Sequence, residues 1–235
     1  CLLPIDSEHS AIFQCLTGRG NNKPKKLILT ASGGPFRGYT SEMLKTVDKA
    51  QALKHPNWNM GAKITVDSAT MMNKGLELIE AVWLFDVLPE QVEIVVHPQS
   101  ILHSAVEFED GSVIGQMGTP DMRIPIQLAL TYPNRCPSCA KPLSLFGVTM
   151  TFEKPDEKAF PCMGLARSAL KKGGNMPCIM NKANEIAVGM FLRDKLSFCE
   201  IPEKISWAME NVGFSEKISL DIITETERET EEILK

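Results

Sequence analysis

Apolar and polar positions divide the chain into a first part of mixed strand and helix patterns and a second part that is helical. In the first part, four apolar stretches have the length of strands: residues 27–29, 92–96, 101–108 and 112–117. A Glu-Asp-Gly turn separates the last two stretches, which predicts a hairpin and therefore an antiparallel sheet.

Beyond residue 157 apolar positions recur at helical spacing. The predicted helices cover residues 161–172, 181–196, 202–211 and 219–235. Residues 136–156 contain three prolines and little periodicity, which is typical of a connector crossing the surface. We therefore expect an α+β fold: a domain of helices and antiparallel sheet at 1–135, a linker at 136–156 and a small helical bundle at 157–235.

Residues 55–77 combine several local patterns in one continuous stretch. Residues 63–66 alternate between polar and apolar side chains, which predicts a short strand, and Asp67-Ser68 is predicted to begin a helix. The apolar residues of that helix follow a 4-3-4 spacing, which predicts one buried stripe: Met72, Leu76, Ile79 and Trp83.

The opposite face of the same helix is polar. Asn73, Lys74 and Glu77 lie within about one turn of each other. A helix start offers free N–H groups and partial positive charge, so Ser68 with Lys74 can hold a phosphate dianion. The alternative is that Ser68 only caps the helix and that Lys74 and Glu77 form an exposed ion pair worth about 0.5 kcal/mol.

A second candidate site opens the chain, where residues 2–5 are predicted to end a buried strand. Asp6 and Glu8 follow two residues apart, so in an extended chain both carboxylates point to the same side. A divalent cation offsets their repulsion, and oxygen ligands favour Mg²⁺ or Mn²⁺, with Glu77 as the third ligand. The alternative is that Asp6 or Ser7 caps the following helix while Glu8 compensates its dipole.

A third candidate is the loop after the first predicted strand. Ser32 is followed by Gly33-Gly34, and paired glycines after a strand can build an anion-binding loop to which Ser32 adds a hydroxyl. Gly-Gly-Pro also marks an ordinary turn, so this motif is weak alone.

The motifs in combination resemble the 1-deoxy-D-xylulose 5-phosphate reductoisomerase family. They are Asp6-Ser7-Glu8, residues 31–37, 55–77, 97–100 and 118–123, and Asn184-Glu185, in unbroken order to about residue 191. The family converts 1-deoxyxylulose 5-phosphate to 2-C-methylerythritol 4-phosphate with NADPH and a divalent metal, in non-mevalonate isoprenoid synthesis. The resemblance implies that this chain carries the catalytic and C-terminal domains. It also implies that the motif at residues 181–185, in which Lys182 departs from the family pattern, braces the catalytic domain.

The resemblance also implies roles for individual residues. Asp6, Glu8 and Glu77 would ligate Mg²⁺ or Mn²⁺, and together with His55 they would form the catalytic set. The substrate would be held by Ser7, Ser32, His55, Trp58, Ser68, Asn73 and Lys74. His55 and Trp58 would belong to a lid, Met122 would lie against the nicotinamide, and the sheet would help form a homodimer.

The family places an NADPH-binding domain ahead of the metal motif, whereas this chain starts at Cys1 and contains no G-x-G-x-x-G. We therefore expect a fragment that lacks the N-terminal domain, which would bind most of the NADPH, and that does not reduce substrate alone. The alternatives are a non-catalytic sugar-phosphate-binding module and an isomerase that needs no nicotinamide.

Composition narrows the function classes. The net charge is −4 and basic clusters are lacking, which argues against nucleic acid as a partner. No apolar run approaches 18 residues, so no membrane association is expected. We expect a cytoplasmic protein, or a plastid protein if a transit segment lies upstream.

Seven scattered cysteines indicate reduced thiols. Cys136 and Cys139 form a C-x-x-C pair, for which a redox pair or half a zinc site are the functional alternatives, although neither is favoured. His97 and His103 alternate with apolar neighbours, which favours structural or interface roles over metal ligation.

Overall fold

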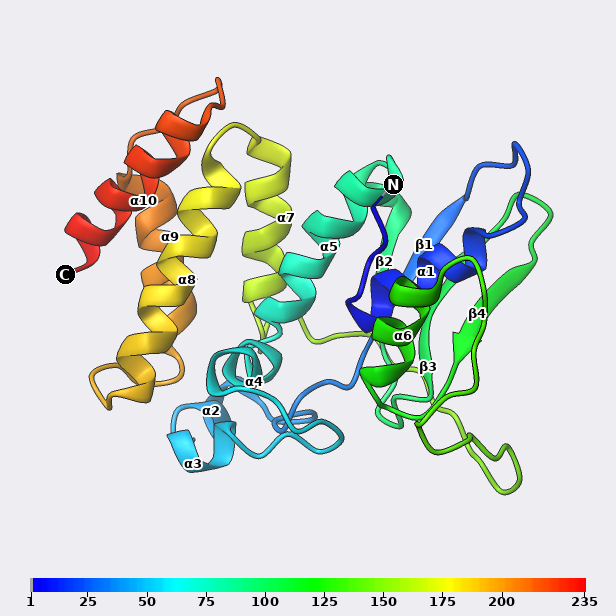
Figure 1. Cartoon of the computed structure of the whole chain (residues 1–235). Helices are drawn as coiled ribbons and strands as arrows, with labels where there is room; N and C mark the ends of the chain where they lie inside the picture. Colours follow the sequence, from blue (N-terminus) through cyan, green and yellow to red (C-terminus); the bar gives the residue numbers. More distant parts are fainter. Residues whose placement is uncertain (1) are drawn as a thin grey trace. The chain divides into compact units, whose positions relative to one another are not determined.

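The computed structural model of the chain describes residues 2–235 (Figure 1). The elements, in chain order, are α1 (Ser7–Leu16), β1 (Lys26–Ala31), α2 (Ser41–Leu44), α3 (Lys49–Ala52), α4 (Ala62–Ala69), α5 (Met72–Phe85), the 3₁₀ helix η1 (Pro89–Gln91), β2 (Val92–Val96), β3 (Leu102–Glu107), β4 (Val113–Met117), α6 (Arg123–Thr131), α7 (Cys162–Lys172), α8 (Met176–Leu192), α9 (Glu200–Asn211) and α10 (Leu220–Leu234). No helix among these residues is long and apolar enough to span a membrane.

The chain forms two compact units, each made of two separate stretches. The sheet unit combines the described residues up to Ser32 with Ala81–Pro155, and the helical unit combines Gly33–Glu80 with Asp156–Lys235. The sheet unit thus ends close to the end of the predicted linker. The domain boundaries proposed from the sequence stay a prediction.

The sheet unit is built on four strands in the order β2-β1-β3-β4. The β3–β4 hairpin and the β1–β3 pair are antiparallel, whereas β1 and β2 are parallel, with Leu27 opposite Val92. Helix α1 contacts β1, β3 and β4 and buries Ala11 and Ile12. The predicted α+β class is confirmed, and the sheet is mixed because a long connection joins β1 to β2 and returns the chain in the same direction.

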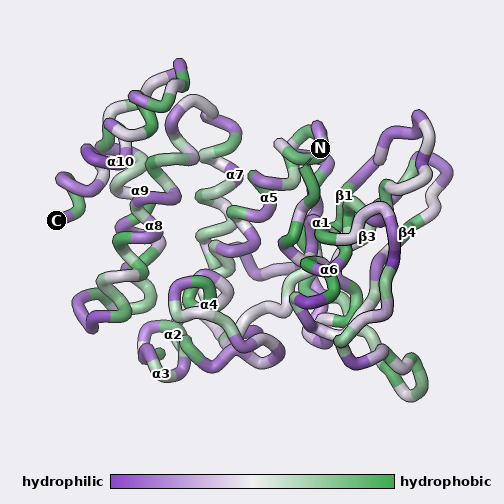
Figure 2. Tube along the Cα trace, viewed as in Figure 1, coloured by the Kyte–Doolittle hydropathy of each residue, from purple (hydrophilic) through white to green (hydrophobic). Residues whose placement is uncertain are grey.

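The helical unit contains the predicted bundle. Helix α8 packs against α7, α9 and α10 and buries Ile179, Met180 and Ala187 (Figure 1). Figure 2 shows hydrophobic and hydrophilic residues mixed along α8, α9 and α10, as expected for helices with one buried face. Helix α8 starts five residues before the predicted position 181 because Pro177 lies in its first turn, where proline is tolerated.

The strand predicted at residues 63–66 is wrong, because this stretch belongs to helix α4. Lys63 Nζ pairs with Asp67 2.7 Å away at i,i+4 spacing, and Thr65 Oγ1 donates to the Gly61 carbonyl at 2.8 Å. Alternation over four residues does not distinguish a strand from a helix turn. As a result, Asp67 and Ser68 lie in the last turn of α4 and do not begin a helix.

Helix α5 begins at Met72, directly after Met71, whose φ of 62° breaks the helix. The predicted stripe is wrong in part: Met72 is fully buried, but Trp83 is 77% exposed, and Leu76 and Ile79 are only half-buried. The buried face instead contains Gly75, where an added Cβ would lie 2.7 Å from the Ala166 Cβ of α7. This close approach of two backbones decides which face of α5 is buried.

The strand predicted at residues 2–5 is also wrong. The segment has no regular secondary structure, and Leu2 and Ile5 are 81% and 48% exposed. Pro4 has no N–H to donate to a strand ladder, which disfavours pairing. The connector predicted at 136–156 contains no helix or strand, apart from an isolated bridge between Glu153 and Val96.

The close contact at Gly75 predicts opposite effects of alanine at two helical glycines. Gly75→Ala should destabilise the protein by about 1–3 kcal/mol, because the new methyl group overlaps Ala166. Gly164→Ala is the control: nothing lies within 4 Å of its added Cβ, so it should stabilise by up to about 1 kcal/mol. Urea unfolding measures both, and an equal effect of the two substitutions would contradict the proposed packing.

Candidate functional site

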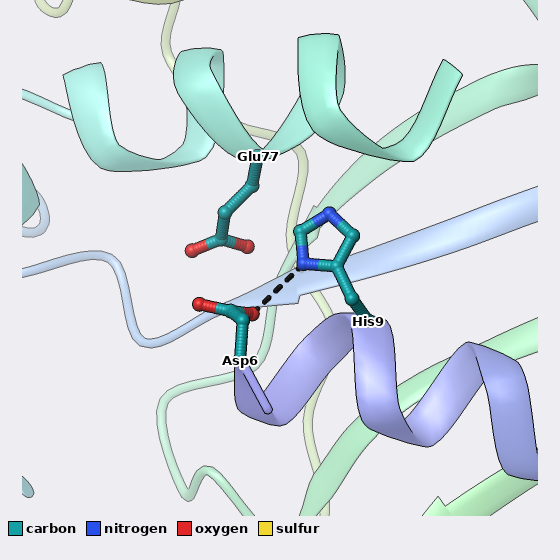
Figure 3. Close-up of side chains that lie close together, drawn as sticks. All are labelled: Asp6, His9 and Glu77. Carbon is teal, nitrogen blue, oxygen red and sulfur yellow. Dashed lines mark hydrogen bonds and ion pairs between the residues drawn. The ribbon is translucent and has the colours of Figure 1, made fainter. Parts of the chain in front are cut away.

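Asp6 is fixed at the start of helix α1. Its carboxylate accepts the Glu8 backbone N–H at 3.1 Å and lies 2.9 Å from His9 Nδ1 (Figure 3). His9 is fully buried and stacks on Phe85 with 6.3 Å between ring centroids. Asp6 is therefore a helix cap, while its side chain keeps 34% exposure. The sequence analysis missed His9, although its i,i+3 spacing from Asp6 on a helix could have indicated the pair.

Ser7 and Glu8 occupy the first turn of α1. The Ser7 hydroxyl donates to the Glu8 carboxylate. The two acidic residues thus follow one another around a helix start, and the extended geometry predicted for them is wrong. Burial lowers the pKa of nearby His103, and the negative charge of Glu8 partly opposes that shift. Asp6 thus caps the helix, as the alternative predicted, and the half-buried Asp6 and Glu8 both lie at the helix start.

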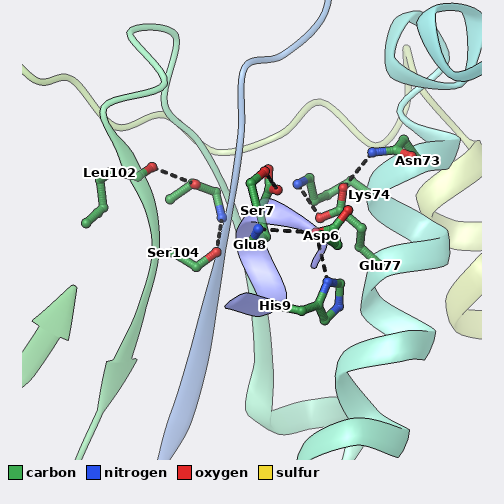
Figure 4. A network of polar contacts seen from close by, with 10 residues as sticks. Asp6, Ser7, Glu8, His9, Asn73, Lys74, Glu77, Leu102 and Ser104 are labelled. Carbon is green, nitrogen blue, oxygen red and sulfur yellow. Dashed lines mark hydrogen bonds and ion pairs between the residues drawn. The ribbon is translucent and has the colours of Figure 1, made fainter. Parts of the chain in front are cut away.

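In the helical unit, Glu77 lies between an amide and an ammonium. Asn73 Nδ2 is 2.5 Å from one Glu77 carboxylate oxygen, and Lys74 Nζ is 2.5 Å from the other (Figure 4). Lys74 and Glu77 are each only 4% exposed, so the alternative of an exposed surface pair is wrong. Burying a charge costs free energy, and such a pair is weak evidence for stability. The binding role predicted for these residues stays a prediction.

The glycine loop lies against the end of α4. Gly33 and Gly34 have φ of 87° and 67°, and a Cβ on Gly34 would lie 2.6 Å from the Ser68 carbonyl oxygen. The structure thus places two predicted phosphate-binding segments next to each other. Ser68 follows most of α4, so the argument from a helix N-terminus does not apply to it. Ser32 is half-buried directly after β1 and is the last residue of the sheet unit's first stretch.

The predicted lid is organised by the His55 ring. Its Nδ1 accepts the backbone N–H of Asn57 at 3.2 Å and that of Trp58 at 3.0 Å. Partial burial lowers the pKa of His55 below its usual value of 6.5. The ring is therefore neutral at pH 7, which is the state that can accept both bonds.

A buried carboxylate that the sequence analysis did not single out holds α4 in place. Asp67 is 1% exposed and accepts Lys63 Nζ at 2.7 Å and Asn184 Nδ2 at 2.9 Å. Burial raises the pKa of Asp67, while the two partners favour its charged form. Asn184 thus braces the candidate site segment, in agreement with the role predicted for it. The spacing of Lys63 and Asp67 could have revealed half of this network.

The structural role predicted for His97 is confirmed. Its Nε2 accepts the N–H groups of Ile101 and Leu102 at 3.1 and 3.2 Å, and its Nδ1 donates to the Thr151 carbonyl at 3.0 Å. The ring stacks on Phe152 with 4.9 Å between centroids. His97 therefore ties the β2–β3 connection to the irregular connector.

The remaining candidates lie in the sheet unit. Met122 is 37% exposed at the start of α6, beside an ion pair of 2.6 Å between Arg123 and Asp121. Cys136 and Cys139 are exposed, and none of the described cysteines forms a disulfide. This agrees with the reduced state expected from the sequence.

Two family models match most of the chain. One described as the 1-deoxy-D-xylulose 5-phosphate reductoisomerase C-terminal domain matches residues 2–85, and one described as the DXP reductoisomerase C-terminal domain matches residues 117–233. The 1-deoxy-D-xylulose 5-phosphate reductoisomerases of Phocaeicola vulgatus and Bacteroides fragilis are 56% and 55% identical to this chain. These alignments cover 99% and 100% of this chain but 60% and 61% of the relatives, so the chain spans about three-fifths of their length.

Solved structures agree with this match. The Zymomonas mobilis reductoisomerase in complex with NADPH has a TM-score of 0.92 and 44% identity, covering 99% of this chain and 60% of that one. A DOX-P reductoisomerase in complex with NADPH, fosmidomycin and magnesium has a TM-score of 0.92 and 42% identity, covering 99% and 62%. At this sequence identity, the likeness indicates a common family and not only a common fold.

The Asp67 network predicts a pH-dependent effect of Lys63→Met. Removing the ammonium leaves a buried carboxylate with Asn184 as its remaining described partner, so stability at pH 8 should fall by about 1–3 kcal/mol. The expected loss is smaller than for a fully buried ion pair, because Lys63 is 43% exposed and solvent screens its charge. Folded Asp67 has a raised pKa and takes up its proton at higher pH than unfolded Asp67, so the loss should shrink as pH falls to 5.

Urea unfolding at pH 8 and pH 5 measures this effect. The control is the same substitution in an Asp67→Asn background, where no buried charge remains and the loss should be smaller at both pH values. A loss that is independent of pH, or equal in the two backgrounds, would contradict the proposed network.

The His55 contacts predict an acid transition of the loop. Below the lowered pKa of His55, Nδ1 carries a proton and cannot accept from Asn57 and Trp58, so Trp58 should become more exposed. Trp58 fluorescence in a Trp83→Phe, Trp207→Phe background should shift to the red, with a midpoint below pH 6.5. His55→Ala in that background should abolish the transition. A midpoint above 6.5 would show that the ring is not held neutral by burial.

Proposed function

The chain belongs to the 1-deoxy-D-xylulose 5-phosphate reductoisomerase family, and we propose that it carries the metal and substrate site of that reaction. The proposed reaction rearranges and reduces 1-deoxy-D-xylulose 5-phosphate to 2-C-methyl-D-erythritol 4-phosphate with NADPH, in non-mevalonate isoprenoid synthesis. The observation that carries the proposal is the buried pair of Lys74 and Glu77 with the half-buried Asn73 beside it, in a chain similar to an enzyme solved with NADPH, fosmidomycin and magnesium.

We propose that Asp6 and Glu8 of the sheet unit and Glu77 of the helical unit ligate one divalent cation. The donor chemistry fits, because carboxylate oxygens suit Mg²⁺ and Mn²⁺, and magnesium is named in three of the similar solved structures. A bound divalent metal supplies a Lewis acid and a template for the ketone oxygen and neighbouring hydroxyl of the substrate. Use of manganese is part of the same proposal.

The chain's own residues orient these ligands. Lys74 and Asn73 each donate to a different oxygen of Glu77, which holds the carboxylate in one orientation. An ammonium has three N–H donors, so Lys74 can bind a substrate oxygen while it keeps Glu77. In the sheet unit, the Asp6 carboxylate is oriented by the Glu8 N–H and by His9. Pre-set ligands of this kind reduce reorganisation during the reaction.

The substrate's phosphate serves as a remote handle. We propose that Ser32, Ser68, Asn73 and Lys74 hold the phosphate and hydroxyl groups, with Ser7 close to the metal. The contact between Gly34 and Ser68 supports this placement, because only a residue without Cβ lets the two backbones approach to this distance. Binding free energy from this non-reacting group can then stabilise the closed lid.

The lid and the cofactor complete the proposal. His55 and Trp58 would cover the substrate and exclude water, with His55 among the catalytic residues, and the two bonds to the His55 ring would keep the loop in one conformation. Met122 would lie against the nicotinamide, in keeping with its partial exposure at the start of α6.

A homodimer through the sheet is also proposed. Strand β4 lies at the edge of the sheet and exposes Val113, Ile114 and Met117 by 58%, 48% and 42%. An exposed apolar edge strand is a surface that a second copy can cover. The cytoplasmic location expected from composition stays a prediction.

Mn²⁺ binding tests the assignment of Glu77. Glu77→Gln should weaken Mn²⁺ binding at least about tenfold, because an amide is a poorer ligand for a hard cation and loses the negative charge. Glu80→Gln, on the exposed side of the same helix, should leave binding unchanged. The loss of the free Mn²⁺ signal in electron paramagnetic resonance measures both, and Asp6→Asn should behave like Glu77→Gln. Equal binding by Glu77→Gln and the unsubstituted chain would refute the metal site.

A further inference from the structure

A cavity of about 400 Å³ lies within the helical unit, in a region that the proposed reaction does not use. Its apolar lining residues come from α2, α7, α9 and the segments before α7 and α9: Leu44, Ala159, Phe160, Pro161, Leu165, Phe198 and Pro202. A concave site of this size with mainly apolar walls is typical of small-molecule binding sites. The apolar lining favours a ligand with a hydrocarbon part.

The charged residues of the cavity favour an anionic group on that occupant. Lys45 and Lys158 line it together with one acidic residue, Glu203, which leaves an excess of positive charge. Lys158 is exposed, and no ion pair of its side chain is found in the described part of the chain. Lys45 pairs with Glu42 at 2.8 Å, but both side chains are more than half exposed, so this pair is readily exchanged.

The cysteines of the cavity argue against covalent or metal chemistry. Burial raises the pKa of Cys162 to about 12, and it also raises the pKa of Cys199. Both thiols are therefore protonated near neutral pH, whereas the thiolate is the nucleophile and the metal ligand. The rest of the lining consists of small side chains: Ser41, Thr70, Cys162, Cys199 and Ser206. The occupant is thus held by apolar contact and by charge.

We propose that this cavity binds a medium-chain alkyl carboxylate, with the chain between Leu44, Leu165 and Phe198 and the carboxylate at Lys158. The apolar walls exclude water from the alkyl chain of the ligand. The Lys158 ammonium attracts the carboxylate, an interaction that a neutral molecule of the same length does not make. This site does not depend on the proposed metal and sugar-phosphate chemistry. Thr70 also precedes the Met71 turn into α5, so the occupant lies beside the segment that leads to Lys74 and Glu77.

Isothermal titration of the full chain with octanoate and with 1-octanol tests the proposal. Octanoate should bind saturably with a stoichiometry of one, and more tightly than 1-octanol. Lys158→Glu should weaken octanoate binding at least about tenfold and leave 1-octanol binding unchanged, because it reverses one exposed charge and keeps the walls. Lys154→Glu is the matched control, since it changes an exposed lysine outside the cavity and should bind octanoate like the unsubstituted chain.

A second variant tests the walls. Leu165→Trp should fill the cavity and abolish binding of both ligands, and thermal unfolding should show that the variant is folded. Absence of saturable octanoate binding to the unsubstituted chain, or unchanged binding by Lys158→Glu, would overturn the proposal. Mn²⁺ binding should be the same in Lys158→Glu and the unsubstituted chain, so failure of this site is distinguishable from failure of the metal site.

Discussion

Burial of charge on helix α5 is the constraint on which the candidate site depends. Glu77 and Lys74 are almost inaccessible to solvent, and a charged group in such surroundings must be paired and hydrogen-bonded. The pairing uses residues of the same helix, with Asn73 and Lys74 one turn before Glu77. Neighbours on the same helix thus orient the Glu77 carboxylate. Its low exposure, in contrast, requires other parts of the fold to cover it.

The surrounding structure satisfies that requirement through close backbone contacts. Gly75 lets α5 approach α7 at Ala166, and Gly34 lets the glycine loop approach the end of α4. Asp67 then fixes α4 to α8 through Asn184, a hydrogen bond between residues 117 positions apart. Each contact relies on a small side chain or on a buried polar group.

Capping and ligation are compatible uses of one carboxylate. Asp6 accepts from the start of α1 and pairs with His9, yet an ionised carboxylate has further lone pairs and Asp6 keeps a third of its surface exposed. The two explanations considered for the opening motif therefore do not exclude each other. A cap fixes the backbone and orients the side chain, and this is also what a pre-organised metal ligand needs.

Local sequence determined the elements that have long hydrophobic patterns or are bounded by turn residues. These are β1, the β3–β4 hairpin, the C-terminal helices and the helix end at Gly173. It also indicated the family, because several motifs of that family follow one another along the chain, and two family models match it. The tertiary structure decided the helical state of residues 63–66, the buried face of α5 and the burial of Asp67. An alternation over only four residues fits the periodicity of a strand and also that of a helix. The face that a helix buries is set by distant partners such as Ala166 and Asn184. Burial is a property of the folded chain, so no local pattern specifies it.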